Sequence, residues 1–216
     1  MASVCNHNSL AWDCATGNGQ AAASSVEHFD KVIATDASAE QIASAATHSK
    51  IEYRVAPAES SGLENNSADL ITVAQALHWF DIERFFYEAT RTLKSGGVLA
   101  VWCYEHCQVA SACDEIIMKI FDAVEDYWPP ERDLVLNHYA GIELPMAEID
   151  AEQFSMTANW TAEQMLGYVR TWSASQRHIK DKGTDPTKEY GGELAAVWGE
   201  GARQVNWPLT HRVGRQ

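Results

Sequence analysis

A glycine turn between two short apolar runs constrains this chain more than any other feature. The first run, Leu10–Trp12, leads into a turn that holds Gly17 and Gly19. The second run, Val32–Thr35, is followed at once by Asp36. A strand, a turn, a helix and a second strand ending in an acid are typical of a nucleotide-type ligand site at the edge of a parallel α/β sheet. Glycine lets the backbone of the turn pass close to a ligand, where a Cβ would collide.

Asp13 indicates which kind of ligand the turn accepts. The spacing Gly17-x-Gly19-x-x-Ala22 also suits a dinucleotide, whose pyrophosphate would lie against the turn. A carboxylate about 4 Å from that anion costs about 4 kcal/mol at an effective dielectric constant of about 20. S-adenosylmethionine has no phosphate, and its sulfonium and ammonium groups are positive. Asp13 therefore favours S-adenosylmethionine. An NAD(P)-dependent oxidoreductase is an alternative, although the chain has no Tyr-x-x-x-Lys pair.

Several segments, taken in order, resemble the class I S-adenosylmethionine-dependent methyltransferases. Residues 13–19 are similar to the acid-x-Gly-x-Gly-x-Gly first motif, with Ala15 in place of the first glycine. Residues 68–80, ADLITVAQALHWF, are similar to the fourth-strand motif of the methyltransferase type 11-like branch related to trans-aconitate methyltransferase. Residues 93–101, LKSGGVLAV, resemble the turn into the fifth strand. The resemblance is strong over residues 9–105 and weaker over residues 160–172 and 206–209.

The resemblance implies a fold as well as an activity. The expected fold is an α/β, Rossmann-like, doubly wound sheet of seven strands in the order 3-2-1-4-5-7-6, with the last strand antiparallel. Residues 1–216 would form a single methyltransferase domain, and residues 103–200 would include a helical insertion that covers the substrate. Only about nine residues precede the first strand, so we expect the family's N-terminal helical segment to be missing. A more open site, cover from another chain, or impaired cofactor binding would follow.

The hydrophobic pattern independently predicts alternating strands and helices over the N-terminal half. The expected strands are residues 10–12, 32–35, 51–55, 70–74 and 98–102, and the expected helices are 20–28, 39–47 and 82–93. Farther along, helices are expected at 111–128, at about 161–171 and at about 186–198. A strand is expected at 154–160, and strand fragments on both sides of Pro208.

The ends of the expected strands supply the cofactor-binding candidates. Asp36 would accept hydrogen bonds from the ribose hydroxyls; its alternative role is a helix N-cap, which Ser38 can also fill. The resemblance implies that Asp13 orients the turn and engages the methionine ammonium, while capping of a helix or of turn amides is its alternative. It also implies adenine contacts just after the third strand. The full set is Asp13, Ala15, Gly17, Gly19, Asp36, Ala58, Glu59 and Gln75.

His78, which follows the fourth expected strand, is the candidate catalytic residue. An imidazole with an unperturbed pKa of about 6.5 suits a general base at neutral pH. His78 could equally order its loop or hydrogen-bond a substrate oxygen. The trans-aconitate branch implies a carboxylate acceptor, which is already ionised and needs no base, whereas a hydroxyl or amine acceptor would. Arg132, Arg170 and Arg177 are candidates to hold a carboxylate, with surface ion pairs as their alternative role.

Composition excludes several classes of partner. The 30 acidic and 16 basic residues give a net charge of −14, which disfavours nucleic acids and anionic membranes. No apolar run approaches the roughly 18 residues of a membrane helix, and the first residues do not form a secretion signal. The five cysteines match no common zinc spacing, so we expect structural thiols and no metal. These features predict a soluble, cytoplasmic protein and leave the oligomeric state open, and the family resemblance implies a small-molecule methyl acceptor.

A third class of function stays open beside the methyltransferase and the oxidoreductase. Ala15 replaces a motif glycine, and Pro57 stands where the family often has an aspartate that accepts the adenine amino proton. Together with the short N-terminal segment, these departures raise the alternative of a non-catalytic or impaired binding protein built on the methyltransferase fold.

Overall fold

The computed structural model describes residues 1–216, which divide into two compact units. Unit 1 comprises residues 1–103, 137–153 and 210–216. Unit 2 comprises residues 104–136 and 154–209. The chain therefore crosses between the units four times, after residues 103, 136, 153 and 209. No helix in either unit combines the length and the apolar character that a membrane crossing demands.

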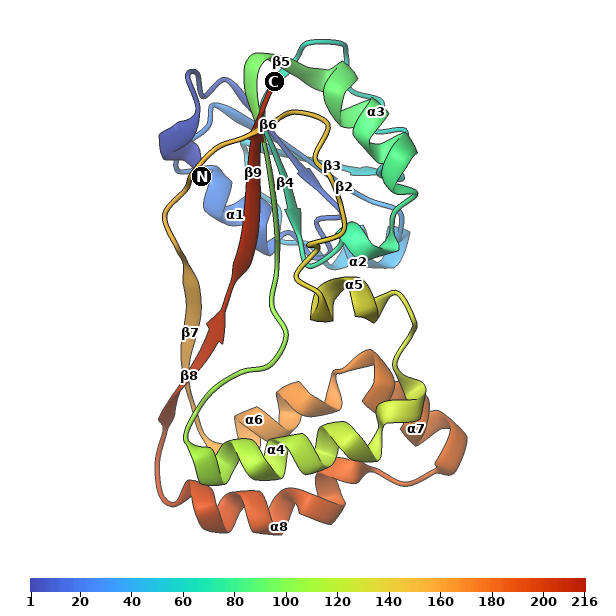
Figure 1. Ribbon diagram of the computed structural model, residues 1–216, viewed down its shortest axis with the longest axis vertical. Helices are drawn as coiled ribbons and strands as arrows, with labels where there is room; N and C mark the ends of the chain where they lie inside the picture. The colour runs from blue at the N-terminus through green and yellow to red at the C-terminus, as the bar shows by residue number, and fades with distance from the viewer. The chain divides into compact units, whose positions relative to one another are not determined.

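Unit 1 is built on a seven-stranded sheet in the order β3-β2-β1-β4-β5-β9-β6 (Figure 1). Its strands are β1 (Leu10–Cys14), β2 (Lys31–Asp36), β3 (Ile51–Val55), β4 (Ala68–Ala74), β5 (Leu93–Cys103), β6 (Ala147–Glu148) and β9 (Thr210–Arg215). Strands β1 to β5 run parallel, and β9 is antiparallel to its neighbours β5 and β6. The predicted strand order and antiparallel last strand are confirmed; the last strand is β9 because unit 2 contributes two further strands.

Three helices connect the parallel strands: α1 (Gln20–Ser25), α2 (Ala39–Ser44) and α3 (Ile82–Thr92). The chain moves across the sheet in one direction from β1 to β3 and in the opposite direction from β4 to β5. Because such crossovers are right-handed, α1 and α2 lie on one face of the sheet and α3 on the other (Figure 1). Two 3₁₀ turns complete unit 1, η1 (Ala2–Val4) and η2 (Leu77–Trp79).

Strand register places a row of four side chains on the α1 face of the sheet. Thr72 of β4 lies beside Asp13 of β1, followed by Ala34 of β2 and Tyr53 of β3. Residues that pair across parallel strands point to the same side of a sheet. Asp13 is thus held between neighbours that the register fixes.

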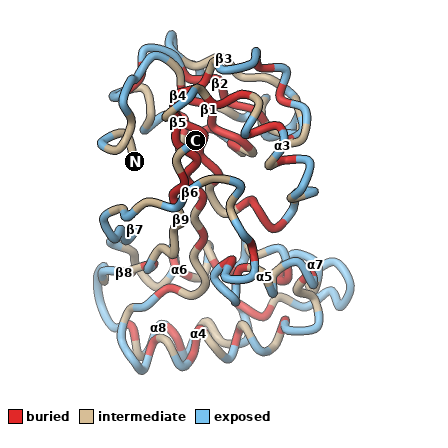
Figure 2. Tube along the Cα trace, turned by 45° about the horizontal axis from the view of Figure 1, so that its top comes forward, coloured by how far each residue is buried: buried red, intermediate tan, exposed pale blue.

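The buried core of unit 1 follows its central strands (Figure 2). Trp12 and Phe85 are both 0 % exposed, and their rings meet edge to face between β1 and α3 with centroids 6.3 Å apart. Burial of such side chains stabilises by about 1.5–3 kcal/mol each. The indole N–H of Trp12 donates to the Thr35 hydroxyl at 2.9 Å, so its polar atom is satisfied.

Unit 2 combines five helices with a two-stranded antiparallel sheet. The helices are α4 (Ser111–Ala123), α5 (Arg132–Leu136), α6 (Ala162–Arg170), α7 (Ser173–Lys182) and α8 (Pro186–Trp198), with the 3₁₀ turn η3 (Glu125–Tyr127). The strands β7 (Ser155–Trp160) and β8 (Arg203–Pro208) pair with each other. The apolar core of unit 2 includes Ile117, Ile120, Met165, Leu194, Trp198 and Trp207.

Most of the helices and strands predicted for unit 2 are present in the structure, but some of their boundaries differ. The helix expected at about 161–171 is α6, and Thr161 and Gln164 form a capping box at its start. The helix expected at residues 111–128 instead ends at Ala123, because Val124 leaves the helical region at φ −115°. The strand fragments on both sides of Pro208 do not belong together. The one before it pairs within unit 2, and the one after it joins the sheet of unit 1.

Candidate functional site

Asp36 joins the glycine turn to the end of β2. Its Oδ2 accepts the Gly17 N–H at 2.9 Å, and its Oδ1 accepts the Ser38 N–H at 2.8 Å. Ser38 is itself the N-cap of α2, so the capping role considered for Asp36 is filled by Ser38. A carboxylate offers about four acceptor positions, and these two hydrogen bonds use two of them. The remaining positions fit the two neighbouring hydroxyls of a ribose.

Asp13 lies beneath the turn and is 1 % exposed. Its Oδ2 accepts from the Thr16 hydroxyl at 2.5 Å, and its Oδ1 accepts from the Thr72 hydroxyl at 2.7 Å. Burial raises the pKa of Asp13, and both hydroxyl hydrogen bonds oppose that rise. These contacts orient the turn. Contact of Asp13 with a methionine ammonium stays a prediction. Sequence reasoning missed Thr72, although its place beside Asp13 follows from the strand register.

Four residues with left-handed backbone follow the ends of two neighbouring strands, β1 and β4. Ala15 has φ 55°, Gly17 57° and Gly19 91°, and Gln75 at the end of β4 has φ 52°, while other such residues lie elsewhere in the chain. For residues other than glycine this conformation costs about 1–2 kcal/mol. Strained backbone is common at functional sites, which agrees with the carboxyl edge of the sheet as the candidate site.

The two glycines of the turn serve different purposes. Beside Gly17, the nearest atom to an added Cβ would be Gln41 Oε1 at 3.9 Å, so this position is open. An added Cβ at Gly19 would collide with the Tyr53 hydroxyl of β3. Gly19 is therefore needed for packing inside the protein, whereas Gly17 matches the prediction of a backbone that leaves room for a ligand. Nothing in the sequence signalled the contribution of Tyr53.

The loop after β3, which holds Ala58 and Glu59, is fastened to α3 at its start. The Glu59 Oε1 accepts the Asp81 N–H at 2.9 Å. Asp81 is the N-cap of α3 and accepts the Arg84 N–H at 3.3 Å. Ala58 is 7 % exposed. Glu59 thus contributes to the shape of the loop through a contact within the protein.

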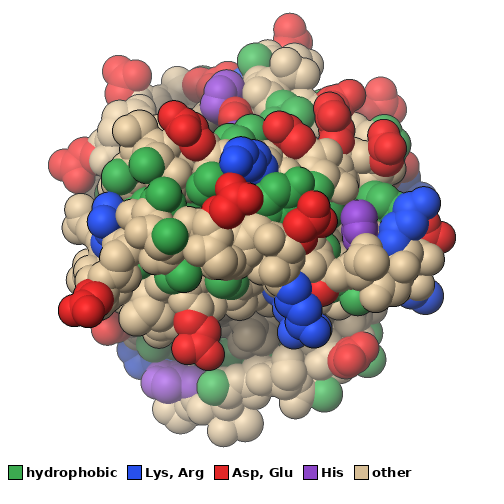
Figure 3. Space-filling view, turned by 90° about the horizontal axis from the view of Figure 1, so that it is seen from below, with side chains coloured by type: hydrophobic (Ala, Val, Ile, Leu, Met, Phe, Trp, Pro, Cys, Tyr) green, Lys and Arg blue, Asp and Glu red, His purple; other side chains and the backbone are tan.

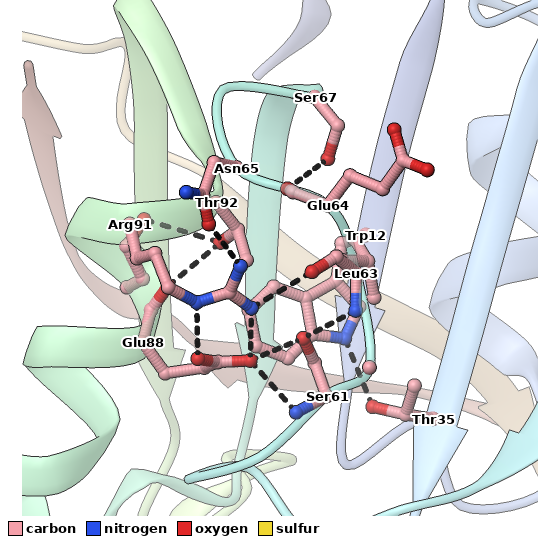
Figure 4. Close-up of polar contacts among 12 residues, drawn as sticks. Trp12, Thr35, Ser61, Leu63, Glu64, Asn65, Ser67, Glu88, Arg91 and Thr92 are labelled. Carbon is pink, nitrogen blue, oxygen red and sulfur yellow. Dashed lines mark hydrogen bonds and ion pairs between the residues drawn. The ribbon is translucent and has the colours of Figure 1, made fainter.

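A second fastening of the same loop is a buried ion pair (Figure 4). Glu88, 5 % exposed, accepts from the N–H and the hydroxyl of Ser61 at 2.8 and 2.5 Å. Arg91 donates to the Glu88 carboxylate through Nε and Nη2, both at 2.8 Å, and to the Leu63 carbonyl at 2.8 Å. Burial raises the pKa of Glu88, but the hydrogen bonds from Arg91 and Ser61 lower it overall. The loop is therefore held by charge-assisted hydrogen bonds at the α3 surface.

His78 lies in η2, directly after β4, and is 8 % exposed. Its Nδ1 lies 3.0 Å from the hydroxyl oxygen of Tyr139. Tyr139 belongs to the 137–153 segment of unit 1 and is 1 % exposed. Sequence reasoning missed Tyr139, because 61 residues separate it from His78 and it belongs to none of the motifs.

Two of the candidate arginines in unit 2 already have partners. The Arg170 Nε lies 3.0 Å from the Asp185 Oδ2, and the Arg177 Nη1 donates to the Tyr127 carbonyl at 3.3 Å. Arg170 ends α6, and Arg177 lies in α7, so the two do not share one continuous helix face. The structure therefore assigns both side chains to contacts within unit 2.

Arg132 is different, because its guanidinium is stacked on aromatic rings, with Glu105 as an electrostatic neighbour. Its guanidinium carbon lies 3.9 Å from the centroid of the Trp128 ring and 5.2 Å from that of Phe121. The Arg132 Nε is buried without a hydrogen-bond partner. Burial lowers the pKa of Arg132. A stacked guanidinium keeps its N–H donors in the plane of the group, where a carboxylate binds.

The cysteines carry no cross-link and gather no metal site. All five are free thiols. The structure contains no group of three or more His, Cys, Asp or Glu side chains that could hold a metal ion.

A parallel sheet of this order, with an antiparallel last strand, a glycine turn after β1 and a carboxylate at the end of β2, defines the class I S-adenosylmethionine-dependent methyltransferase fold. The family model described as a methyltransferase domain matches residues 12–101. A protein of Dictyostelium discoideum, provisionally named a methyltransferase, is 33 % identical over 83 % of this chain and 70 % of its own length. The chain belongs to the S-adenosylmethionine-dependent methyltransferase family.

Two further similarities agree with this membership. A solved structure from Anaeromyxobacter dehalogenans, provisionally described as a type II methyltransferase, is 36 % identical with a TM-score of 0.91, over 99 % of this chain and 92 % of that one. A Saccharomyces cerevisiae protein, named a probable S-adenosylmethionine-dependent methyltransferase, is 24 % identical over 81 % of this chain and 72 % of its own length. Membership implies the use of S-adenosylmethionine. The relation to trans-aconitate methyltransferase stays a prediction.

Proposed function

We propose that this enzyme holds S-adenosylmethionine at the carboxyl edge of the unit 1 sheet and methylates a carboxylate of a small molecule. The observation that supports this choice of acceptor is Arg132, a half-buried cation whose Nε has no hydrogen-bond partner. This proposal keeps the prediction that residues 103–200 include the part of the chain that covers the substrate.

Asp36 carries the cofactor part of the proposal. Its two spare acceptor positions suit the ribose hydroxyls, and the open space beside Gly17 suits the passage of the ligand along the turn. Burial places the Asp13 charge directly under this turn, where it favours a cation over a phosphate. We propose the same set of cofactor-binding residues as before: Asp13, Ala15, Gly17, Gly19, Asp36, Ala58, Glu59 and Gln75.

The argument for a carboxylate acceptor is that an unsatisfied N–H group of the Arg132 guanidinium costs free energy, which a bound anion would recover. A buried donor without a partner costs about 1–3 kcal/mol, and the Arg132 Nε is such a donor. Stacking on Trp128 occupies the face of the guanidinium and not the edge that carries its N–H donors. Since the other two candidate arginines already have partners, Arg132 is the group of the three that best fits an anionic acceptor.

The chemistry asks little of the protein beyond positioning. When bound, S-adenosylmethionine supplies a methyl group whose departing thioether is neutral, so the leaving group needs no proton. A carboxylate is ionised at neutral pH and needs no base, so orientation in a dry site provides most of the rate. An oxygen paired with Arg132 is a weaker nucleophile. We therefore expect acids with a second carboxylate, one held and one methylated, to be the better acceptors.

Thermal unfolding with ligands tests the cofactor assignment. S-adenosylmethionine or S-adenosylhomocysteine should raise the Tm, by an amount that corresponds to about 2.7 kcal/mol at a hundred times Kd, and NADH should not. Asp36→Ala should abolish the shift, whereas the exposed control Asp30→Ala should keep it. A shift with NADH alone would indicate the oxidoreductase. A folded chain that binds neither ligand at millimolar concentration would indicate the non-catalytic alternative.

A methyl-transfer screen tests the acceptor. The enzyme is offered mono- and dicarboxylic acids, together with their amides and the matching alcohols, and methyl esters are detected by mass. Arg132→Gln should raise the KM for the acid about tenfold or more, as expected for the loss of a charged hydrogen bond, without changing the Kd for S-adenosylmethionine. Arg132→Lys should recover part of the loss. The exposed control Arg84→Gln should match the wild type. Faster methylation of alcohols or amides than of acids would overturn the assignment.

A further inference from the structure

We infer that Tyr139 is a positioning residue: its hydroxyl donates to Nδ1 of His78 and thereby keeps the imidazole proton on Nε2. The catalytic meaning of this inference rests on the proposed function, because it makes His78 a hydrogen-bond donor toward an anionic acceptor instead of a general base. The hydrogen bond itself rests only on contacts within unit 1.

The two side chains are held firmly against each other. The distance from Nδ1 to the hydroxyl oxygen is 3.0 Å, and the two rings are inclined by only 28° with centroids 6.3 Å apart. The Trp79 ring also contacts the imidazole, with centroids 4.7 Å apart. Tyr139 and His78 are 1 % and 8 % exposed. Water therefore competes little for this hydrogen bond.

The backbone at the start of η2 indicates which partner donates in the hydrogen bond between Tyr139 and His78. The first N–H groups of a helical turn have no partner within the turn, and the N-cap residue Ala76 provides no side-chain cap. Burial raises the pKa of Tyr139, while the backbone N–H groups of His78 and Leu77 on the side of its hydroxyl oxygen lower it. A hydroxyl oxygen that faces N–H donors acts as an acceptor toward them. This arrangement favours a hydroxyl proton directed to the imidazole, with Nδ1 as its acceptor.

The backbone around Tyr139 is strained so as to place this hydroxyl. His138 and Tyr139 both have left-handed backbones, at φ 55° and 56°, although neither is glycine. Contacts with β9 hold them there. The Arg212 Nη1 donates to the Tyr139 carbonyl at 2.9 Å and also to the Ile142 carbonyl, and the Thr210 hydroxyl lies 2.9 Å from the His138 Nδ1. A strained pair that is fastened by several contacts is the pattern expected of a functional position.

The consequence concerns the role of His78. A neutral imidazole that accepts at Nδ1 carries its proton on Nε2, so Nε2 donates and cannot take a proton from an acceptor. Such a group can orient a carboxylate oxygen, which needs no base. The structure therefore favours hydrogen bonding over general base catalysis, the two roles that the sequence left open.

Nitrogen NMR of the histidine rings tests the tautomer without cofactor or acceptor. In the wild type, the His78 signals, assigned by their loss in His78→Gln, should show a protonated Nε2 and a hydrogen-bonded, unprotonated Nδ1. Tyr139→Phe should shift the Nδ1 signal, whereas the exposed control Tyr87→Phe, at 75 % exposure, should not. A proton on Nδ1 in the wild type would overturn the inference even if Tyr139→Phe fails to fold.

Kinetics then test the role of the hydrogen bond. Tyr139→Phe should lower kcat/KM for the acceptor about tenfold, as expected for one lost hydrogen bond, and leave the Kd for S-adenosylmethionine unchanged. His78→Gln should keep more activity than His78→Asn, since its amide N–H falls near the position of Nε2. Equal losses of about 10²–10⁴-fold in both variants would indicate a general base and overturn the donor role. If no acid is methylated, the proposed function fails, and the ring spectra still decide the tautomer.

Discussion

Ala15 sits at the position where this chain departs from the glycine of the methyltransferase motif, and its backbone keeps the conformation that glycine favours. The turn retains its left-handed φ of 55° at this residue. An L-residue in this region costs about 1–2 kcal/mol, so the Ala15 methyl group strains the backbone while the turn keeps its conformation. The replacement of the motif glycine by Ala15 therefore lowers stability locally.

Replacing Ala15 with glycine should remove this strain. We expect Ala15→Gly to stabilise unit 1 by about 0.5–1 kcal/mol, after allowing for the greater freedom of glycine in the unfolded chain. Such a gain corresponds to a rise in Tm of about 1–4 °C, measurable by calorimetry. Ala23→Gly, within α1, should shift the Tm in the opposite direction. A lower Tm for Ala15→Gly would show that the turn makes use of the methyl group.

Site residues could be predicted where the signal is local. Asp36 and Asp13 adjoin apolar runs, so their position at strand ends follows from the sequence alone. The role of Tyr139 could not be predicted, because 61 residues separate it from His78. Its left-handed backbone could not be predicted either, because the residue is not a glycine. The interest of Arg132 depends on its buried Nε, which has no hydrogen-bond partner, and only tertiary packing determines this.

At the scale of elements, helix α3 holds the loop after β3 through Glu88, and the contribution of this contact to stability can be measured. A buried ion pair that loses one partner destabilises by about 3–5 kcal/mol. Glu88→Gln keeps the volume and one acceptor, so we expect about 2–3 kcal/mol of destabilisation at pH 7, measured by urea unfolding. The exposed neighbour Glu83→Gln is the matched control and should change stability by less than about 0.5 kcal/mol.

The same pair predicts how stability changes with pH. The pKa of Glu88 is lowered in the folded state. Its contribution is therefore present above the unfolded pKa of about 4.3 and is lost as the pH falls through the folded value. The difference in unfolding free energy between wild type and Glu88→Gln should be largest at pH 7 and shrink below about pH 4. An equal difference at pH 7 and pH 3.5 would show that volume and not charge is responsible.

Elements with strong apolar periodicity were predictable, and polar or short ones were not. The strands β1 to β4 and helix α3 were found within a few residues. Helix α7 was missed because its sequence, SASQRHIKDK, has a single large apolar residue. The strand β5 begins at Leu93, earlier than expected, because Leu93 pairs with Ala68 on β4 across an irregular register.

At the scale of the whole molecule, the net charge of −14 predicts weak attraction for polyanionic partners. Acidic side chains are spread over the face shown in Figure 3, with basic groups scattered among them. We expect no binding to duplex DNA or to anionic vesicles, even at low salt, measured by fluorescence anisotropy and co-sedimentation. Binding that weakens steeply with added salt would reveal a basic surface and contradict this prediction.

The strand order was predicted from the family resemblance, since hydrophobic periodicity alone specifies strands and not their neighbours. The division into two units was not predicted. It depends on which distant segments pack together: residues 137–153 and 210–216 return to unit 1 after long excursions into unit 2. A single sequence carries no direct signal for such long-range pairing.

The fastening of the β3 loop to α3 limits where this enzyme can be re-engineered. Two residues separate helix α3 from the turn that carries His78, and residues of α3 and its N-cap also hold the loop expected to meet the nucleobase. A change on this helix that touches no ligand would thus disturb cofactor affinity and turnover together. Libraries intended to widen the range of acceptors should spare α3 and concentrate their diversity around Arg132.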